Sequence, residues 1–63
     1  SSPIQYAIHC RMECAKKQLN ETNLSIQQIA LDLGYDNPNY FNLLFKKMTG
    51  KSPGKYRKEN KNR

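Results

Sequence analysis

The chain has 63 residues, 37% of them hydrophobic, and its 11 Lys and Arg residues against 5 Asp and Glu residues give a net charge of +6. This length allows one small domain and excludes the large core that most enzymes need. No apolar run approaches the roughly 20 residues of a membrane-spanning helix, and no secretory signal opens the chain. We therefore expect a soluble, cytoplasmic protein without a membrane partner.

The first half of the chain contains two predicted helices. Ser2 and Pro3 are typical of a helix start, and apolar residues then recur at helical spacing, which predicts a helix as far as residue 20. Ser25 and Gln28 have the spacing of a capping box, so a short second helix follows and ends at Gly34. The expected inward residues are Ile4, Ile8, Met12, Ala15 and Leu19 in the first helix, and Ile26, Ile29, Ala30 and Leu33 in the second.

A third helix begins at Pro38, with Asn37 as its N-cap, and ends at Gly50. Its helical wheel separates an apolar side (Phe41, Leu44, Phe45 and Met48) from an opposite side (Asn39, Asn42, Leu43 and Lys46). Ser52 and Pro53 then start one more short turn of helix, which carries Tyr56.

Basic residues are concentrated at the end of the chain. Residues 46–63 hold eight of the eleven basic side chains, with Glu59 as the acidic one: Lys46, Lys47, Lys51, Lys55, Arg57, Lys58, Lys61 and Arg63. Such a concentration is the electrostatic pattern of a protein that binds a polyanion. For Lys61 and Arg63 the alternative is a solvated tail.

The chain shows no sign of a catalytic or cofactor site. Cys10 and Cys14 lie four residues apart on the first helix and, with His9, make a poor metal set, so we expect two partly buried thiols in a reducing cytoplasm; zinc is the alternative. Tyr6, Tyr35 and Tyr56 are interpreted as packing residues. There is no Ser-His-Asp set, phosphate-binding glycine loop or pair of catalytic carboxylates, and we predict neither an enzyme nor a cofactor.

Residues 25–57, "SIQQIALDLGYDNPNYFNLLFKKMTGKSPGKYR", resemble the second helix-turn-helix of the AraC/XylS family of bacterial transcription regulators. Residues 2–20, with "SPIQY" and "RMECA", resemble the linker helix of that family. The resemblance implies an all-α, homeodomain-like helix-turn-helix after a long linker helix, with residues 1–20 as linker helix, 21–58 as the second unit and 59–63 as a basic tail. The family has two such units, each closed by Ser-Pro-x-x-Tyr, so we expect a fragment without the first unit and without the effector domain of its parent.

Two features of the linker helix carry further expectations. Its apolar arc is widened by Tyr6, Ala7, Cys10 and Cys14, and we hypothesise that the missing upstream unit packs there; a merely wide core face is the alternative. Arg11 matches the Arg of the Arg-x-x-x-Ala phrase of the family. We expect it to bond to backbone carbonyls or to an acidic neighbour rather than to DNA.

The resemblance implies sequence-specific binding of double-stranded DNA. In a helix-turn-helix the second helix, here about residues 38–49, enters the major groove with residues near its N-terminus reaching the bases. The expected base-reading residues are Pro38, Asn39, Tyr40, Asn42 and Leu43, and the expected phosphate contacts are Ser25, Asn37, Lys46, Lys47, Lys51, Lys55 and Arg57. Leu43 stands where the family often has a longer polar or basic residue; it is either a thymine contact or an ordinary exposed leucine.

A second interpretation belongs to another class of function. The chain could be a basic helical adaptor that binds a protein through the same exposed face, and RNA polymerase is the partner we consider. Specific DNA recognition distinguishes the two, because an adaptor would not discriminate between duplexes.

Overall fold

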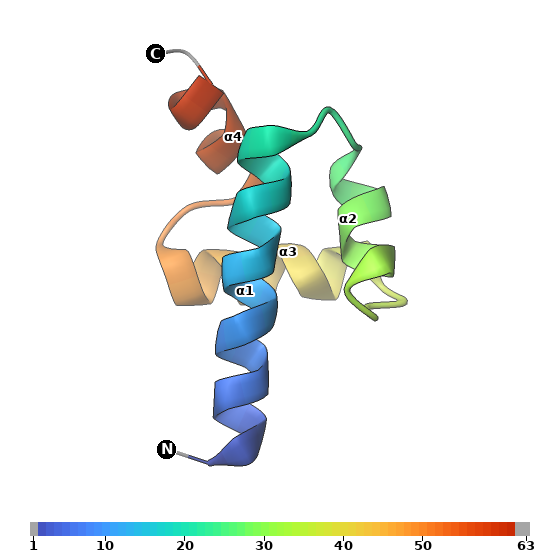
Figure 1. Cartoon of the computed structure of the whole chain (residues 1–63), viewed down its shortest axis with the longest axis vertical. Helices are drawn as coiled ribbons and strands as arrows, with labels where there is room; N and C mark the ends of the chain where they lie inside the picture. The colour runs from blue at the N-terminus through green and yellow to red at the C-terminus, as the bar shows by residue number, and fades with distance from the viewer. Residues whose placement is uncertain (1, 62–63) are drawn as a thin grey trace.

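The computed structural model describes residues 2–61, which form four helices and, within this range, no strand. Their bounds are Pro3–Glu21 for α1, Ile26–Asp32 for α2, Pro38–Thr49 for α3 and Pro53–Lys61 for α4. Figure 1 shows α1 along the longest axis, α2 beside its C-terminal half, α3 crossing it, and α4 near its C-terminal end. None of these helices combines the length and the apolar character needed to cross a membrane. Arg63 of the predicted tail lies outside the described residues.

Each of the first three helices begins at the cap that the sequence predicts. The Ser2 hydroxyl accepts the Gln5 N–H at 3.1 Å, and Gln5 Oε1 accepts the Ser2 N–H at 3.4 Å, which completes a capping box. Ser25 accepts the Gln28 N–H at 3.0 Å, but the reciprocal half of the predicted capping box is missing. The Gln28 amide instead donates to Asp32 Oδ1 at 2.8 Å, one helical turn ahead.

Two glycines with left-handed backbone conformation separate the helices. Gly34 has φ 97° in the turn between α2 and α3, and Gly50 has φ 86° at the C-cap of α3. Residues with a Cβ rarely adopt such angles, so glycine at both positions sets where the helices end. The pair α2 and α3, joined by this tight turn, has the connectivity of a helix-turn-helix.

The core lies where α1, α2 and α3 meet. Its buried members are Met12, Ala15, Leu19, Ile29, Ala30, Phe41 and Phe45, with Ile8, Ile26, Leu33, Tyr35, Leu44 and Tyr56 packed against them. These are the predicted inward positions, with two corrections. Ile4 is 73% exposed and Met48 is 48% exposed. The first turns of α1 project past α3 (Figure 1), and Ile4 belongs to the first of them, whereas Met48 lies in the last turn of α3.

Helix α4 is longer than the single turn that the sequence predicts. It extends to Lys61, so the backbone of residues 59–61, the first part of the predicted basic tail, is helical. The Tyr56 ring meets the Phe45 ring edge-on, with 5.5 Å between the centroids. The Arg57 guanidinium donates to the backbone carbonyls of Leu19 at 3.1 Å and Thr22 at 3.3 Å. These bonds satisfy carbonyls at the C-terminal end of α1 and fix α4 against it.

Candidate nucleic-acid interface

The beginning of α3 is held by its cap and presents polar and aromatic side chains to solvent. Asn37 Oδ1 accepts the Asn39 N–H at 2.9 Å, and Pro38 occupies the first helical position. The side chains of α3 that are exposed to solvent on the side away from the core form what we call the outer face of α3: Asn39, Tyr40, Leu43, Lys46 and Lys47. Tyr40 is 54% exposed and Leu43 is 71% exposed.

Asn42 departs from its predicted place on the exposed side of the helix. It is half-buried, and its Oδ1 is buried without a hydrogen-bond partner among the described residues. Position 42 lies about 100° from Phe41 and about 60° from Phe45 around the helix, so it borders the core rather than opposing it. Asn42 is therefore not presented to a ligand in the way that Asn39 is.

The predicted phosphate-binding lysines differ in what they contact. Lys46 and Lys47 are exposed in the last turns of α3, and Lys55 is exposed in the first turn of α4. Lys51, between the two helices, forms a salt bridge with Glu59. The hydrogen bond from Lys51 lowers the pKa of the Glu59 carboxyl below its usual value. Sequence reasoning missed this pair, because Lys51 lies in the linker before α4, where no helical spacing relates it to Glu59.

Three other predicted phosphate contacts have structural bonds within the domain. The side chains of Ser25 and Asn37 cap α2 and α3, which leaves other backbone N–H groups of each first turn free of intrahelical partners. Arg57 is bound to two carbonyls of the α1 terminus. Arg57 therefore has a role within the fold, where it holds α4 against the end of α1.

The exposed surface of α1 corrects three expectations. Cys10 and Cys14 are free thiols and exposed rather than partly buried, and Tyr6 is 66% exposed rather than packed. These residues lie on the side of α1 that α2, α3 and α4 leave uncovered. No cluster of three or more His, Cys, Asp or Glu side chains in residues 2–61 is placed to hold a metal ion.

Arg11 also has a partner that the sequence did not indicate. Its guanidinium carbon lies 5.8 Å from the centroid of the Tyr35 ring, in a cation–π arrangement. The bonds to backbone carbonyls that we expected of Arg11 are made by Arg57. No local pattern links positions 11 and 35, because the two residues meet only when α1 packs against the turn after α2.

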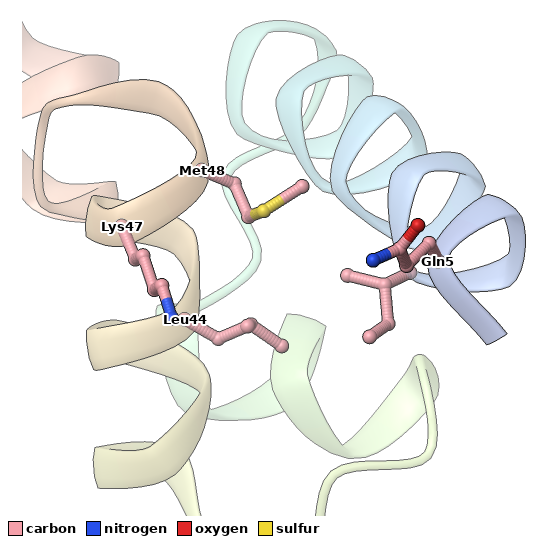
Figure 2. A pocket seen from close by; sticks show the side chains of 5 residues that line it. Gln5, Leu44, Lys47 and Met48 are labelled. Atoms are coloured by element: carbon pink, nitrogen blue, oxygen red, sulfur yellow. The ribbon is translucent and has the colours of Figure 1, made fainter. Parts of the chain in front are cut away.

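An apolar cleft opens between the N-terminal half of α1 and the C-terminal half of α3. Its volume is about 420 Å³, and it is lined by Gln5, Ile8, Leu44, Lys47 and Met48. In Figure 2, Leu44 and Met48 point from α3 toward Gln5 on α1. Lys47 thus borders both the cleft and the outer face of α3.

Comparison with known proteins agrees with this geometry. A family model described as a helix-turn-helix domain matches residues 1–59. YdiP of Escherichia coli (strain K12), an uncharacterized HTH-type transcriptional regulator, is 44% identical over 61 residues, which cover 97% of this chain and 20% of YdiP. The C-terminal domain of AraT, a response regulator from Geobacillus stearothermophilus, superimposes with a TM-score of 0.90 at 42% identity. The chain belongs to the AraC-type helix-turn-helix family.

The chain spans only part of the length of the relatives that it matches. It covers 20% of YdiP and 49% of the solved AraT domain, with 94% of its own length aligned to the latter. The C-terminal domain of the two-component response regulator yesN from Fusobacterium nucleatum superimposes with a TM-score of 0.88 at 37% identity, over 90% of this chain and 55% of that one. The described residues of this AraC-type chain are all-α, and the family to which it belongs consists of DNA-binding helix-turn-helix domains of transcription regulators rather than of enzymes.

Proposed function

We propose that this AraC-type domain reads DNA sequence with α3 lying in the major groove. The observation that carries the proposal is the outer face of α3, where exposed Asn39, Tyr40 and Leu43 lie near the capped start of the helix. Asn suits a bidentate pair of hydrogen bonds with adenine, and an apolar side chain suits the thymine methyl group. We propose Asn39 and Leu43 as the main base contacts, with Pro38 and Tyr40 beside them. Asn42 remains a weaker candidate because it must leave its half-buried position.

Phosphate binding is assigned to the lysines and helix starts around this face. Lys46, Lys47 and Lys55 are exposed, Lys51 is shared with Glu59, and the first turns of α2 and α3, after Ser25 and Asn37, offer backbone N–H groups. If about five phosphates are neutralised, the logarithm of the binding constant falls with the logarithm of the salt concentration with a slope of roughly −4 to −5.

The first experiment selects a preferred duplex from random sequences and compares its affinity with that of a scrambled duplex. We expect at least a tenfold preference, which Asn39→Ala removes, whereas Lys47→Ala weakens binding to both duplexes about equally. Lys17→Ala, which removes the same charge from an exposed position on α1, serves as the control and leaves both affinities nearly unchanged. A salt slope near zero, or equal affinity for both duplexes, would contradict the proposal.

We propose further that the exposed side of α1 is covered by an upstream helix-turn-helix unit in a longer parent protein that also carries an effector domain. Tyr6, Cys10 and Cys14 expose an aromatic ring and two thiol groups along this side. The relatives supply independent support, because this chain matches about half of the solved AraT domain. Because this chain has one of the two helix-turn-helix units of the proposed parent, it should bind DNA weakly on its own. We place the parent in the cytoplasm, where its DNA is.

A protein partner is the second candidate, and the cleft between α1 and α3 favours it. The cleft combines apolar walls with the cation of Lys47 at its edge, a composition that suits a partner helix with apolar and acidic side chains. RNA polymerase is the partner we propose to test. Retention of binding to a polymerase subunit by the Asn39→Ala variant, with no discrimination between duplexes by the unsubstituted domain, would favour this adaptor function.

A further inference from the structure

A series of ring contacts joins α1 to the start of α3. We propose that Arg11 is a positioning residue for DNA reading, which acts through Tyr35 to fix Tyr40 on the outer face of α3. The inference rests on the proposed function of α3 and deepens it, because it names how a residue on a different helix sets the geometry of the face that reads bases.

The distances support a continuous arrangement. The Arg11 guanidinium carbon lies 5.8 Å from the Tyr35 ring centroid, and the Tyr35 and Tyr40 centroids are 5.9 Å apart with their planes at 49°. Tyr35 also meets the buried Phe41 ring at 5.7 Å. All three separations fall within the ranges over which cation–π and ring–ring attraction operate. Tyr35 therefore bridges the core, the α1 cation and a ring that is half exposed to solvent.

The position of Tyr35 depends on these ring contacts more than on its hydroxyl. Its OH is buried without a hydrogen-bond partner among the described residues, so no bond at the tip of the side chain fixes the ring. The backbone of Tyr35 is held by its N–H, which donates to the Ala30 carbonyl at 2.9 Å. The Tyr35 side chain is thus held by its backbone and by contacts with its ring, and Arg11 supplies a cation–π contact from α1.

Tyr40 is where such support matters for function. It is the third residue of α3, in the part of a recognition helix that reaches the bases. A free tyrosine side chain would lose rotational freedom on meeting DNA, and a side chain already held against Tyr35 loses less. Arg11 should therefore raise affinity for the preferred duplex without touching DNA itself.

A double-mutant cycle tests the proposal. Arg11→Gln keeps a polar side chain of helix-forming type but removes the cation, and we expect it to weaken binding to the selected duplex about two- to fivefold, in line with one exposed cation–π contact. In the Tyr40→Ala background the same substitution should change affinity less than about twofold, because its target is gone. Tyr35→Phe, which keeps the ring and removes the unpaired hydroxyl, is the matched control and should bind like the unsubstituted domain.

A direct phosphate contact by Arg11 gives a different pattern. Arg11→Gln would then weaken binding to selected and scrambled duplexes alike, and the loss would persist with Tyr40→Ala; either result overturns the proposal. Circular dichroism at the assay temperature checks that every variant is folded, so that a loss of folded protein is not counted as a loss of affinity.

A second measurement needs no DNA and separates this inference from the proposed function. In the free domain, Arg11→Gln should shift the NMR resonances of the Tyr40 ring and the Asn39 amide, while the ring of Tyr56, which packs on Phe45, stays unchanged. Unmoved Tyr40 resonances overturn the positioning role even if the domain reads DNA. If the Tyr40 resonances move but the domain does not discriminate between duplexes, Arg11 and Tyr40 are coupled and the proposed reading of DNA sequence is wrong.

Discussion

At the scale of single residues, the structure divides basic side chains into those available to a ligand and those committed to the fold. Lys46 and Lys47 are exposed, Lys51 is paired with Glu59, and Arg57 is bonded to carbonyls of α1. The sequence composition does not distinguish these residues, because all of them belong to one basic segment. The difference between Lys and Arg explains part of the division, because the planar guanidinium can satisfy two carbonyls at once.

The Lys51–Glu59 pair gives a pH-dependent prediction. The Lys51 hydrogen bond lowers the pKa of Glu59 from its usual 4.5 in the folded chain, so the stabilisation is present above that value and is lost as the pH falls through the lowered pKa. Glu59→Gln should therefore flatten the decline of the unfolding temperature in acid. Both side chains are over two-fifths exposed, at 44% and 41%, so the effect should be small.

Thermal unfolding followed between about pH 3 and pH 6 measures this difference. Glu21→Gln, the same change at an exposed position near the end of α1, controls for the loss of one carboxylate. Identical acid profiles for Glu59→Gln and the unsubstituted domain would show that the salt bridge contributes nothing to stability.

At the scale of helices, the beginnings and ends are determined locally, which is why they could be predicted. Ser2, Ser25 and Asn37 cap helices because each side chain bonds to a backbone N–H two or three residues ahead. Asn42 and the second half of α4 could not be predicted in this way. Their surroundings depend on how one helix packs on another, which a helical wheel does not contain.

Three glycines allow a matched test of what ends α3 and starts α4. Gly50→Ala should lower the free energy of unfolding by about 1–2 kcal/mol, because alanine is strained at a left-handed φ of 86° even though its Cβ would meet no neighbour within 4 Å. Gly54→Ala should raise it by about 0.5–1 kcal/mol, since Gly54 lies in α4 and a Cβ there would meet Ile26 Cδ1 at 3.6 Å, an ordinary contact.

Denaturant unfolding of the two variants and of Gly34→Ala, at φ 97°, provides the comparison. Gly34→Ala should resemble Gly50→Ala. Equal effects at Gly50 and Gly54 would show that local backbone conformation does not govern these positions.

At the scale of the whole molecule, the arrangement of the helices explains which residues are left exposed. The periodicity of α1 predicted one inward face along its full length, yet α3 crosses only part of that length, so Met12 is buried and Ile4 is not. Cys10 and Cys14 are exposed for a different reason, because they lie on the side of α1 that faces away from the other helices. The contacts of Arg57 with Leu19 and of Arg11 with Tyr35 join residues far apart in sequence, and they follow from the assembled fold alone.

The uncovered side of α1 leads to a prediction for the longer parent. In this chain both Cys10 and Cys14 are exposed, and we expect a chromogenic thiol reagent to modify both rapidly. In a chain that carries the proposed upstream unit, modification should slow by roughly tenfold or more, because reaction then requires that unit to open. The variants Cys10→Ser and Cys14→Ser give the modification rate of each remaining thiol separately, and denatured protein gives the maximal modification rate. Unchanged rates in the longer chain would place the upstream unit elsewhere.

The bonds from Arg57 to the end of α1 have a consequence for the order of synthesis. Their acceptors, Leu19 and Thr22, precede Arg57 by 38 and 35 residues. A ribosome releases the acceptors first, and the α1 terminus stays hydrated until α4 emerges. We therefore expect a nascent chain to complete this fold only once its fourth helix has left the exit tunnel.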